Sequence, residues 1–429
     1  MNFVPAMPLR VLSSVACLLL VATGFAEEPW NRFRGPNGSG ISEAKTVPVR
    51  WTESDYNWKI ALPGPGHSSP VVWENRVFVT CGDPATALRT LLCIDAATGR
   101  TLWKHEEPSQ KYPQHGDNNY ASATPAVDAD GVVVAWTTPE AVMLLALDLD
   151  GREQWRRNLG PLVSLQGSGS SPIIFDNLVV LANDQEDMER GPGRKKDGPN
   201  PAGKSFIVAL ERKSGKTRWQ TDTTTYLAGY STPCVYQDGD RRELVFSCTA
   251  HGILALDPAS GKIAWQFGQP FLDRAVISPV IAPGLVIAGH GAGLRGTRVV
   301  AVRPPDKQRG PELAYVLTRA LPMVPTPLVK DGRLYLWADD GVVACYRVAT
   351  GQMLWQGRTE GGFYASPVWV GGHLYNVSKK GDVVVLAAGD EIRLVHRISL
   401  GEPSYATPAI SGGVMYLRTA THLFSLGKQ

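Results

Sequence analysis

The sequence predicts an all-β fold, an eight-bladed β-propeller of four-stranded antiparallel blades, on three observations. A Ser/Thr-Pro pair followed by apolar residues recurs eight times, a Gly-Trp turn motif follows most of these pairs, and the last unit lacks one strand. Repeats with periods of 40 to 60 residues are typical of units that bury their faces only against one another. The composition agrees, because 44 Gly and 32 Pro in 429 residues supply many turns.

The repeated pairs place the innermost strand of each unit. We expect the proline to be the first residue of this strand, where a missing backbone N–H does no harm. The eight pairs are Ser69-Pro70, Thr124-Pro125, Ser171-Pro172, Thr232-Pro233, Ser278-Pro279, Thr326-Pro327, Ser366-Pro367 and Thr407-Pro408.

A second motif marks the turn between the third and fourth strands, named C and D when the four strands are lettered A to D from the axis outward. It reads A-L-D-P-A-S-G-K-I-A-W at 255–265, with Gly for a positive φ and Trp in strand D. The fifth unit keeps only Tyr315 in place of Trp, and the seventh has lost the motif. We expect the tryptophans to be mostly buried at the seams between blades: Trp58, Trp103, Trp155, Trp219, Trp265 and Trp355.

The two ends of the chain complete one blade. The segment 423–429 supplies a strand C with no strand D after it, whereas 56–64 reads as a strand D with no unit before it. Trp58 lies 12 residues before Pro70, the same spacing as from Trp355 to Pro367. We therefore expect 56–62 to pair with 422–427, so that the N-terminal strand closes the ring and removes an open edge.

The repeat A-x-D-x-x-[TS]-G-x-x-x-W resembles the tryptophan-docking motif of the pyrroloquinoline-quinone (PQQ)-like propeller family, which has BamB-like and quinoprotein alcohol dehydrogenase-like members. The resemblance covers about residues 56–429 and is weakest in the fifth and seventh units. The stretch W-N-R-F-R-G-P-N-G-S-G-I-S at 30–42 is similar to the lead-in of exported bacterial members. The resemblance implies the propeller fold, with two possible functions that are weighed below.

The first 26 residues have the features of a secretory signal peptide. Arg10 is the only charge before Glu27, the apolar run 11–21 follows it, and small residues precede a cleavage site after Ala26. The run is too short for a good transmembrane helix, and no later segment is apolar enough to span a membrane. A lipoprotein would instead need cleavage at Cys17, which lies inside the run.

The domain organisation follows: a signal peptide at 1–26, a lead-in segment at 27–55 and the propeller at 56–429. We expect the mature chain to be exported to the periplasm or the extracellular space. The formal net charge of +3 gives no electrostatic reason to expect nucleic acid as a partner. Five cysteines remain, and Cys234 and Cys248 either pair across a hairpin or stay buried thiols; the other three are Cys81, Cys93 and Cys345.

Loop lengths point to one face of the ring. In a propeller, the loops from strand D to A and from B to C emerge at the same face, which we call the loop face. The longer connections all fall there, at 82–90, 106–120, 183–204 and 289–297. Loops on a rigid scaffold commonly carry binding function. The acidic and basic residues of 184–196 are expected to form a solvated mixed-charge loop.

Residues just before strand A should line the axial opening at the loop face. His67 and three tyrosines occupy the position three residues before a proline in four of the units, with two asparagines and one arginine nearby. Polar groups that converge on a cavity favour a ligand pocket, although the aromatic rings can equally plug the channel. The candidate binding residues are His67, Asn118, Asn119, Tyr230, Arg274, Tyr364 and Tyr405.

Two functions remain open. The first is an exported, non-catalytic binding or scaffold propeller, with a protein or small polar ligand on the loop face, no cofactor and no metal site. The second is a dehydrogenase that uses PQQ and Ca²⁺ on the axis, and that needs a catalytic base, metal ligands and a flat clamp over the quinone. In the related dehydrogenases this clamp is often a disulfide between adjacent cysteines, which the chain does not contain.

Overall fold

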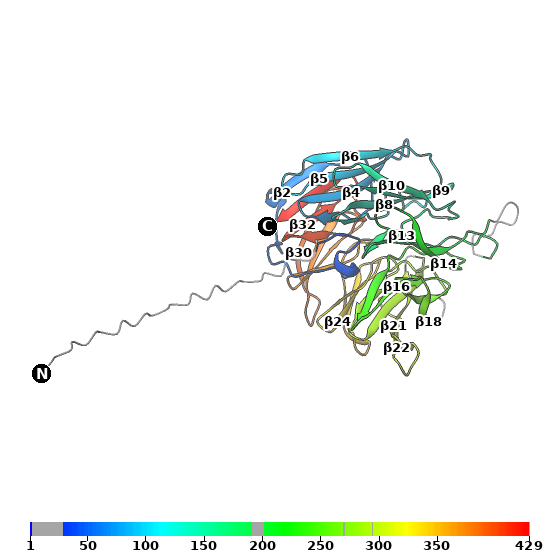
Figure 1. Cartoon of the computed structure of the whole chain (residues 1–429). Coiled ribbons are helices and arrows are strands. Elements are labelled where there is room, and N and C mark those ends of the chain that lie inside the picture. The colour runs from blue at the N-terminus through cyan, green and yellow to red at the C-terminus, as the bar shows by residue number, and fades with distance from the viewer. Residues whose placement is uncertain (2–28, 191–200, 269–270, 294, 429) are drawn as a thin grey trace.

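The computed structural model describes residue 1 and residues 29–190, 201–268, 271–293 and 295–428. Their strands form eight sheets around a common axis (Figure 1), and the predicted all-β, eight-bladed propeller is confirmed. The predicted signal peptide lies outside the described residues except for Met1. No helix among the described residues is long and apolar enough to cross a membrane.

Each blade is an antiparallel sheet whose strands follow one another in the chain. Blade one consists of β3 (Val71–Trp73), β4 (Arg76–Gly82), β5 (Arg89–Asp95) and β6 (Thr101–Glu107), and blade two of β7 (Ala126–Asp128), β8 (Gly131–Thr138), β9 (Ala141–Leu147) and β10 (Glu153–Asn158). Blade three consists of β11 (Ile173–Phe175), β12 (Leu178–Asn183), β13 (Phe206–Glu211) and β14 (Thr217–Asp222), and blade four of β15 (Cys234–Asp238), β16 (Arg241–Cys248), β17 (Gly252–Leu256) and β18 (Ile263–Phe267).

The remaining blades follow the same order. The last two each include one strand from the N-terminal part of the chain, which is a fifth strand in blade seven and the fourth strand in blade eight. Blade five consists of β19 (Val280–Ala282), β20 (Leu285–Ala292), β21 (Arg295–Arg303) and β22 (Glu312–Leu317), and blade six of β23 (Leu328–Lys330), β24 (Arg333–Trp337), β25 (Val342–Arg347) and β26 (Gln352–Arg358). Blade seven consists of β27 (Val368–Val370), β28 (His373–Val377), β29 (Asp382–Ala387) and β30 (Leu394–Ser399), with β1 (Ile41–Ser42) as an extra strand. Blade eight consists of β31 (Ala409–Ser411), β32 (Val414–Arg418) and β33 (His422–Gly427), with β2 (Tyr56–Ala61) as its strand D.

The ring closes as the sequence predicts. Strand β2 pairs antiparallel with β33, with Trp58 opposite Ser425 and Ala61 opposite His422. In Figure 1 the blue N-terminal strand lies beside the red C-terminal strands. Each proline of the repeated pairs stands immediately before strand A rather than within it, because the first ladder position is taken by the following residue, such as Val71 after Pro70.

A ring of hydrogen bonds ties the blades together at the axis. The hydroxyl of the Ser/Thr-Pro pair in one blade accepts a hydrogen bond from the backbone N–H of the equivalent residue in the preceding blade. Seven such bonds, of 2.9–3.1 Å, run from Ser69 to Thr124, Thr124 to Ser171, Thr232 to Ser278, Ser278 to Thr326, Thr326 to Ser366, Ser366 to Thr407 and Thr407 to Ser69.

The lead-in segment enters the axial channel from the face opposite the loops. Trp30 and Arg34 are buried, and backbone carbonyls of Trp30 and Asn31 accept hydrogen bonds from strands A of blades one and two. Short 3₁₀ turns at Pro36–Gly38 and Glu53–Asp55 redirect the chain, and β1 adds a fifth, parallel strand to blade seven. This segment therefore closes one end of the channel.

The repeat tryptophans lie at the seams between blades. The Trp219 indole N–H donates to the Pro258 carbonyl at 2.8 Å, and a Cβ built on Gly261 of the same turn would approach its ring to 2.5 Å. The turn therefore needs glycine both for its φ of +69° and for the close approach of the indole. Trp155, Trp219 and Trp265 are buried, whereas the other three are partly exposed: Trp58, Trp103 and Trp355.

Blade five shows what happens where the motif is lost. Trp265 of blade four meets no Ser/Thr-Gly turn in blade five, and its indole N–H donates instead to Glu243 Oε2 at 2.6 Å. Tyr315 takes the tryptophan position of blade five, and its hydroxyl donates to the Val348 carbonyl at 2.7 Å. A tyrosine can therefore replace tryptophan at a seam when its hydroxyl reaches the carbonyl of the next turn.

We predict that Trp219→Ala lowers the free energy of unfolding by about 3–5 kcal/mol, because it leaves a cavity at a packed seam and an unmet carbonyl. Trp219→Tyr should lose much less, since Tyr315 already makes the equivalent contact in blade five. Equilibrium denaturation followed by fluorescence of the remaining tryptophans measures both. Equal, near-wild-type stability of the two variants would show that the indole does not hold the seam.

Candidate functional site

A pocket of about 380 Å³ opens on the axis at the loop face. Phe33 of the lead-in segment contributes to its lining from the closed end of the channel, so the pocket is blind. All eight ring hydroxyl residues line it. So do all eight residues that stand three positions before the prolines: His67, Ser122, Gly169, Tyr230, Val276, Val324, Tyr364 and Tyr405.

The pocket contains six of the seven residues that the sequence singles out: His67, Asn118, Tyr230, Arg274, Tyr364 and Tyr405. Asn119 is not part of the lining, because its side chain is turned into its own loop, where Oδ1 accepts a hydrogen bond from the Ala121 N–H at 2.8 Å. Whether these residues bind a ligand stays a prediction.

Aromatic rings form one wall of the pocket. The His67 and Tyr405 rings are stacked with their centroids 4.2 Å apart, and Tyr364 meets Tyr405 edge-on at 5.7 Å. The ammonium of Lys379 lies 4.3 Å from the centre of the Tyr364 ring, a favourable cation–π arrangement. Burial and the charges of Arg418 and Lys379 lower the pKa of His67 to about 3, although Asp117 opposes the shift, so His67 is neutral at physiological pH.

A strap crosses the rim of the pocket. It is the connection 108–125 between blades one and two, and its Asp117 reaches blades seven and eight. Asp117 pairs with Lys379 at 2.8 Å and accepts hydrogen bonds from the hydroxyls of Tyr364 at 3.1 Å and Tyr405 at 3.3 Å. Burial alone would raise the pKa of Asp117, but these three donors outweigh it and hold the pKa below its usual value.

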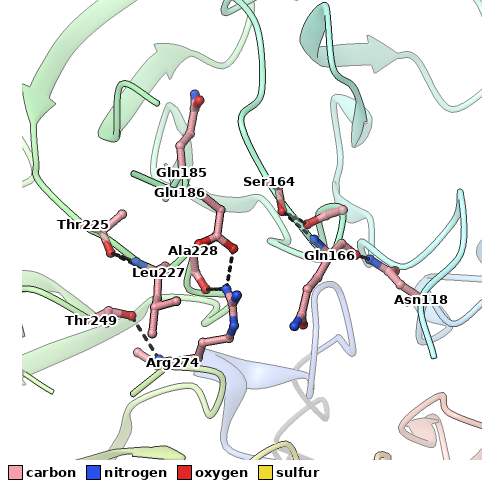
Figure 2. A network of polar contacts seen from close by, with 12 residues as sticks. Asn118, Ser164, Gln166, Gln185, Glu186, Thr225, Leu227, Ala228, Thr249 and Arg274 are labelled. Atoms are coloured by element: carbon pink, nitrogen blue, oxygen red, sulfur yellow. Dashed lines mark hydrogen bonds and ion pairs between the residues drawn. The ribbon is translucent and has the colours of Figure 1, made fainter. Parts of the chain in front are cut away.

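The opposite wall is built around Arg274 (Figure 2). Its guanidinium pairs with Glu186 at 2.7 Å and donates to the Ala228 carbonyl at 3.0 Å. A buried carboxylate therefore neutralises the charge of Arg274. On the same side, Asn118 donates to the Gln166 carbonyl at 2.7 Å.

The loops of blades three and five differ from expectation. Asp184, Gln185 and Glu186 are buried rather than solvated, because they pack beneath the axial rim, where Glu186 meets Arg274. Burial raises the pKa of Asp184 to about 7, although a backbone N–H of Gly229 opposes the shift. Of the rest of the predicted mixed-charge loop, Glu189 and Arg190 are exposed as expected and Asp187 is partly exposed, whereas 191–196 lie outside the described residues. Most of 289–297 extends the β20–β21 hairpin instead of forming a loop.

Sequence reasoning missed Asp117, Lys379 and Phe33. Lys379 stands in the short turn between β28 and β29, where no insertion draws attention to it. Asp117 lies within the long connection that the sequence does mark, but nothing local distinguishes it from its neighbours. Their partnership spans 262 residues of chain and is visible only once the ring has closed.

The pocket does not match the requirements of a PQQ- and Ca²⁺-dependent dehydrogenase. Asp117 alone among the described lining residues carries a carboxylate, and Lys379 already pairs with it. No group of three His, Cys, Asp or Glu side chains among the described residues is placed to hold a metal ion. The five cysteines of the described chain are buried free thiols, so Cys234 and Cys248 are not joined across their hairpin.

The fold and the pocket define a PQQ-type propeller with a blind axial pocket and a strapped rim. A family model described as outer membrane protein assembly factor BamB matches residues 52–188, 144–309 and 339–426, which together make up most of the chain. The chain therefore belongs to this BamB family, and the expected PQQ-like membership is confirmed.

Individual relatives are distant. BamB of Yersinia pestis is 27% identical over 292 residues, covering 65% of this chain and 67% of its own. The crystal structure of BamB from Moraxella catarrhalis matches 87% of this chain and 96% of that one, with a TM-score of 0.59 and 15% identity. A europium-containing methanol dehydrogenase matches 94% and 98%, with a TM-score of 0.50 and 12% identity. At these identities the two structures show the fold alone.

The strap predicts a pH dependence. Because the pKa of Asp117 is lowered on folding, its contribution to stability is present above the unfolded-state value of about 4 and is lost as pH falls through the folded value. We expect Asp117→Asn to lower the melting temperature at pH 7, with the gap to wild type narrowing below about pH 4. Thermal melts across pH measure this. A gap that stays constant down to pH 2 would mean that the Asp117 charge does not stabilise the strap.

Proposed function

We propose that this protein is an exported, non-catalytic propeller of the cell envelope that binds a protein partner on its loop face. The relatives from Yersinia pestis and Moranella endobia support this reading, because both are named as outer membrane protein assembly factors. An exported location follows from the signal-like residues 1–26. No catalytic group is proposed in the pocket.

The main support for the proposal is the length of the connections between strands on the loop face. On the face opposite the loops, strands A and B are joined in every blade by a two-residue turn. On the loop face, the connections 108–125 and 184–205 are far longer than their counterparts in other blades. Long loops on a rigid scaffold commonly carry binding function.

The loop face also carries a groove and exposed apolar side chains. A groove of about 1060 Å³ runs between 159–163, 202–206 and 220–226. Leu165 and Leu272, in the connections on either side of it along the ring, are 42% and 69% exposed. Exposed apolar side chains beside a groove are suited to anchoring a partner segment. We place the centre of the partner surface over blades two to four.

Site-specific photocross-linking in the producing cell tests the surface. A photoreactive residue at Leu165 or Leu272 should give discrete protein adducts, whereas the same residue at Lys213 or Lys262, exposed in turns of the opposite face, should not. Adducts from the opposite face alone would contradict the proposal. Dye-linked alcohol oxidation by the purified protein that depends on added PQQ and Ca²⁺ would contradict its non-catalytic part.

Export gives a separate prediction. If residues 1–26 are a cleaved signal, intact-mass measurement of protein recovered from the envelope or the medium should show a chain that begins at Glu27. Replacing apolar residues of the run 11–21 by charged ones should keep the protein uncleaved inside the cell. A full-length mass in the exported fraction would contradict cleavage after Ala26.

A further inference from the structure

The hydroxyls of the eight Ser/Thr-Pro pairs, which we call the ring hydroxyls, have hydrogen-bond donors without a protein acceptor among the described residues. Each is nearly or fully buried, and seven of them accept a backbone N–H from the neighbouring blade. Within the described part of the chain, none of the eight donates a hydrogen bond to a protein acceptor. A hydroxyl carries one donor as well as its acceptor sites, so the wall of the pocket presents a circle of available O–H donors.

Buried cations lie directly behind this circle. Arg34 donates to the carbonyls of Pro327 at 2.8 Å and Pro367 at 3.1 Å, the residues next to Thr326 and Ser366. Arg32 donates to the Pro233 carbonyl, and Arg418 donates to the Ser68 carbonyl at 2.9 Å. All three guanidinium groups are held by neutral acceptors, and none forms an ion pair with a carboxylate of the described residues.

The arginines keep their charge in spite of burial. Burial lowers the pKa of Arg34 to about 9 and that of Arg32 to about 10, which still leaves both cationic at neutral pH. The Nε–H groups of all three arginines have no hydrogen-bond partner among the described residues. A buried cation without a counter-ion is costly, and an anion nearby lowers that cost.

Three carboxylates of the loop face, of which only Asp117 lines the pocket, already have partners. Asp117 pairs with Lys379 at the rim, Glu186 pairs with Arg274, and Asp339 accepts hydrogen bonds from the Met323 and Val324 N–H groups. Asp184 lies in the same loop as Glu186. The lead-in arginines therefore give the closed end of the pocket a positive field, which the rim carboxylates do not cancel locally.

We propose that the closed end of the axial pocket binds a small monoanionic oxyanion, a carboxylate, between Thr326 and Ser366. The Thr326 N–H donates to the Ser366 hydroxyl at 2.9 Å, so the two hydroxyls lie close enough for one carboxylate to receive both O–H donors. Arg34 lies behind this sector and supplies the charge. Phe33 and Val324 add apolar side chains to the lining of the pocket. The proposal concerns the interior of the pocket and is independent of the partner surface on the loops.

Titration with ¹³C-labelled acetate tests the proposal, with chloride at equal ionic strength as the reference. We expect saturable acetate binding to the wild-type protein, and Thr326→Val should weaken it on the order of tenfold, because a donor to a charged group is lost. Thr326→Ser keeps the hydroxyl and should bind acetate like the wild type. Thr124→Val removes an equivalent ring bond at a seam where no arginine of the described residues donates a hydrogen bond to the adjacent proline carbonyl, and should also retain binding.

The outcomes separate the site from a general effect of salt. Phosphate and sulfate serve as competitors, and displacement of acetate by either one at lower concentration would replace the carboxylate with that oxyanion as the ligand. Absence of saturable acetate binding to the wild type would overturn the proposal. Equal weakening by Thr326→Val and Thr124→Val would also overturn it, since it would show that only the integrity of the ring matters. Neither result depends on the photocross-linking of the loop face.

Discussion

The hydrogen bond from a backbone N–H to the Ser/Thr hydroxyl of the next blade is the contact on which the rest of this propeller depends. It joins neighbouring strands A at the axis, where the eight hydroxyl residues line the pocket. The proline that follows has no N–H, and the ladder of strand A begins at the residue after it. The inter-blade bonds thus set the diameter of the channel, and with it the dimensions of the pocket.

Two further sets of contacts make the two ends of the channel chemically different. From one face, the lead-in segment buries Arg32 and Arg34 against carbonyls of strands A and places Phe33 against the pocket. From the other, the strap brings Asp117 onto Lys379. The scaffold is symmetric in its repeats, but these two segments are not repeated. The chemistry of the axis therefore comes from the parts of the chain that break the symmetry.

The repeat motif made most of the fold predictable. Pairs such as Thr326-Pro327 locate strands A, the Gly-Trp turns locate the seams, and the spacing of Trp58 identifies the closing strand. The pocket was predictable only in outline, because positions such as His67 and Tyr405 are fixed relative to a proline. Asp117 and Lys379 could not be paired from the sequence, since loop conformation decides which residue of a connection reaches the rim. The buried state of Arg34 was also hidden, because an arginine in a lead-in segment ordinarily reads as exposed.

The pairing of β2 with β33 means that the ring closes only when its last strand has been made. Synthesis begins at the N-terminus, so β2 is made among the first strands of the ring and its partner β33 is made after the others. A product truncated before His422 leaves β2 without its partner strand and exposes sheet edges at an open seam. Such edges can pair with another copy of the chain, so an incomplete chain is prone to aggregate or to exchange strands, whereas a complete one is sealed.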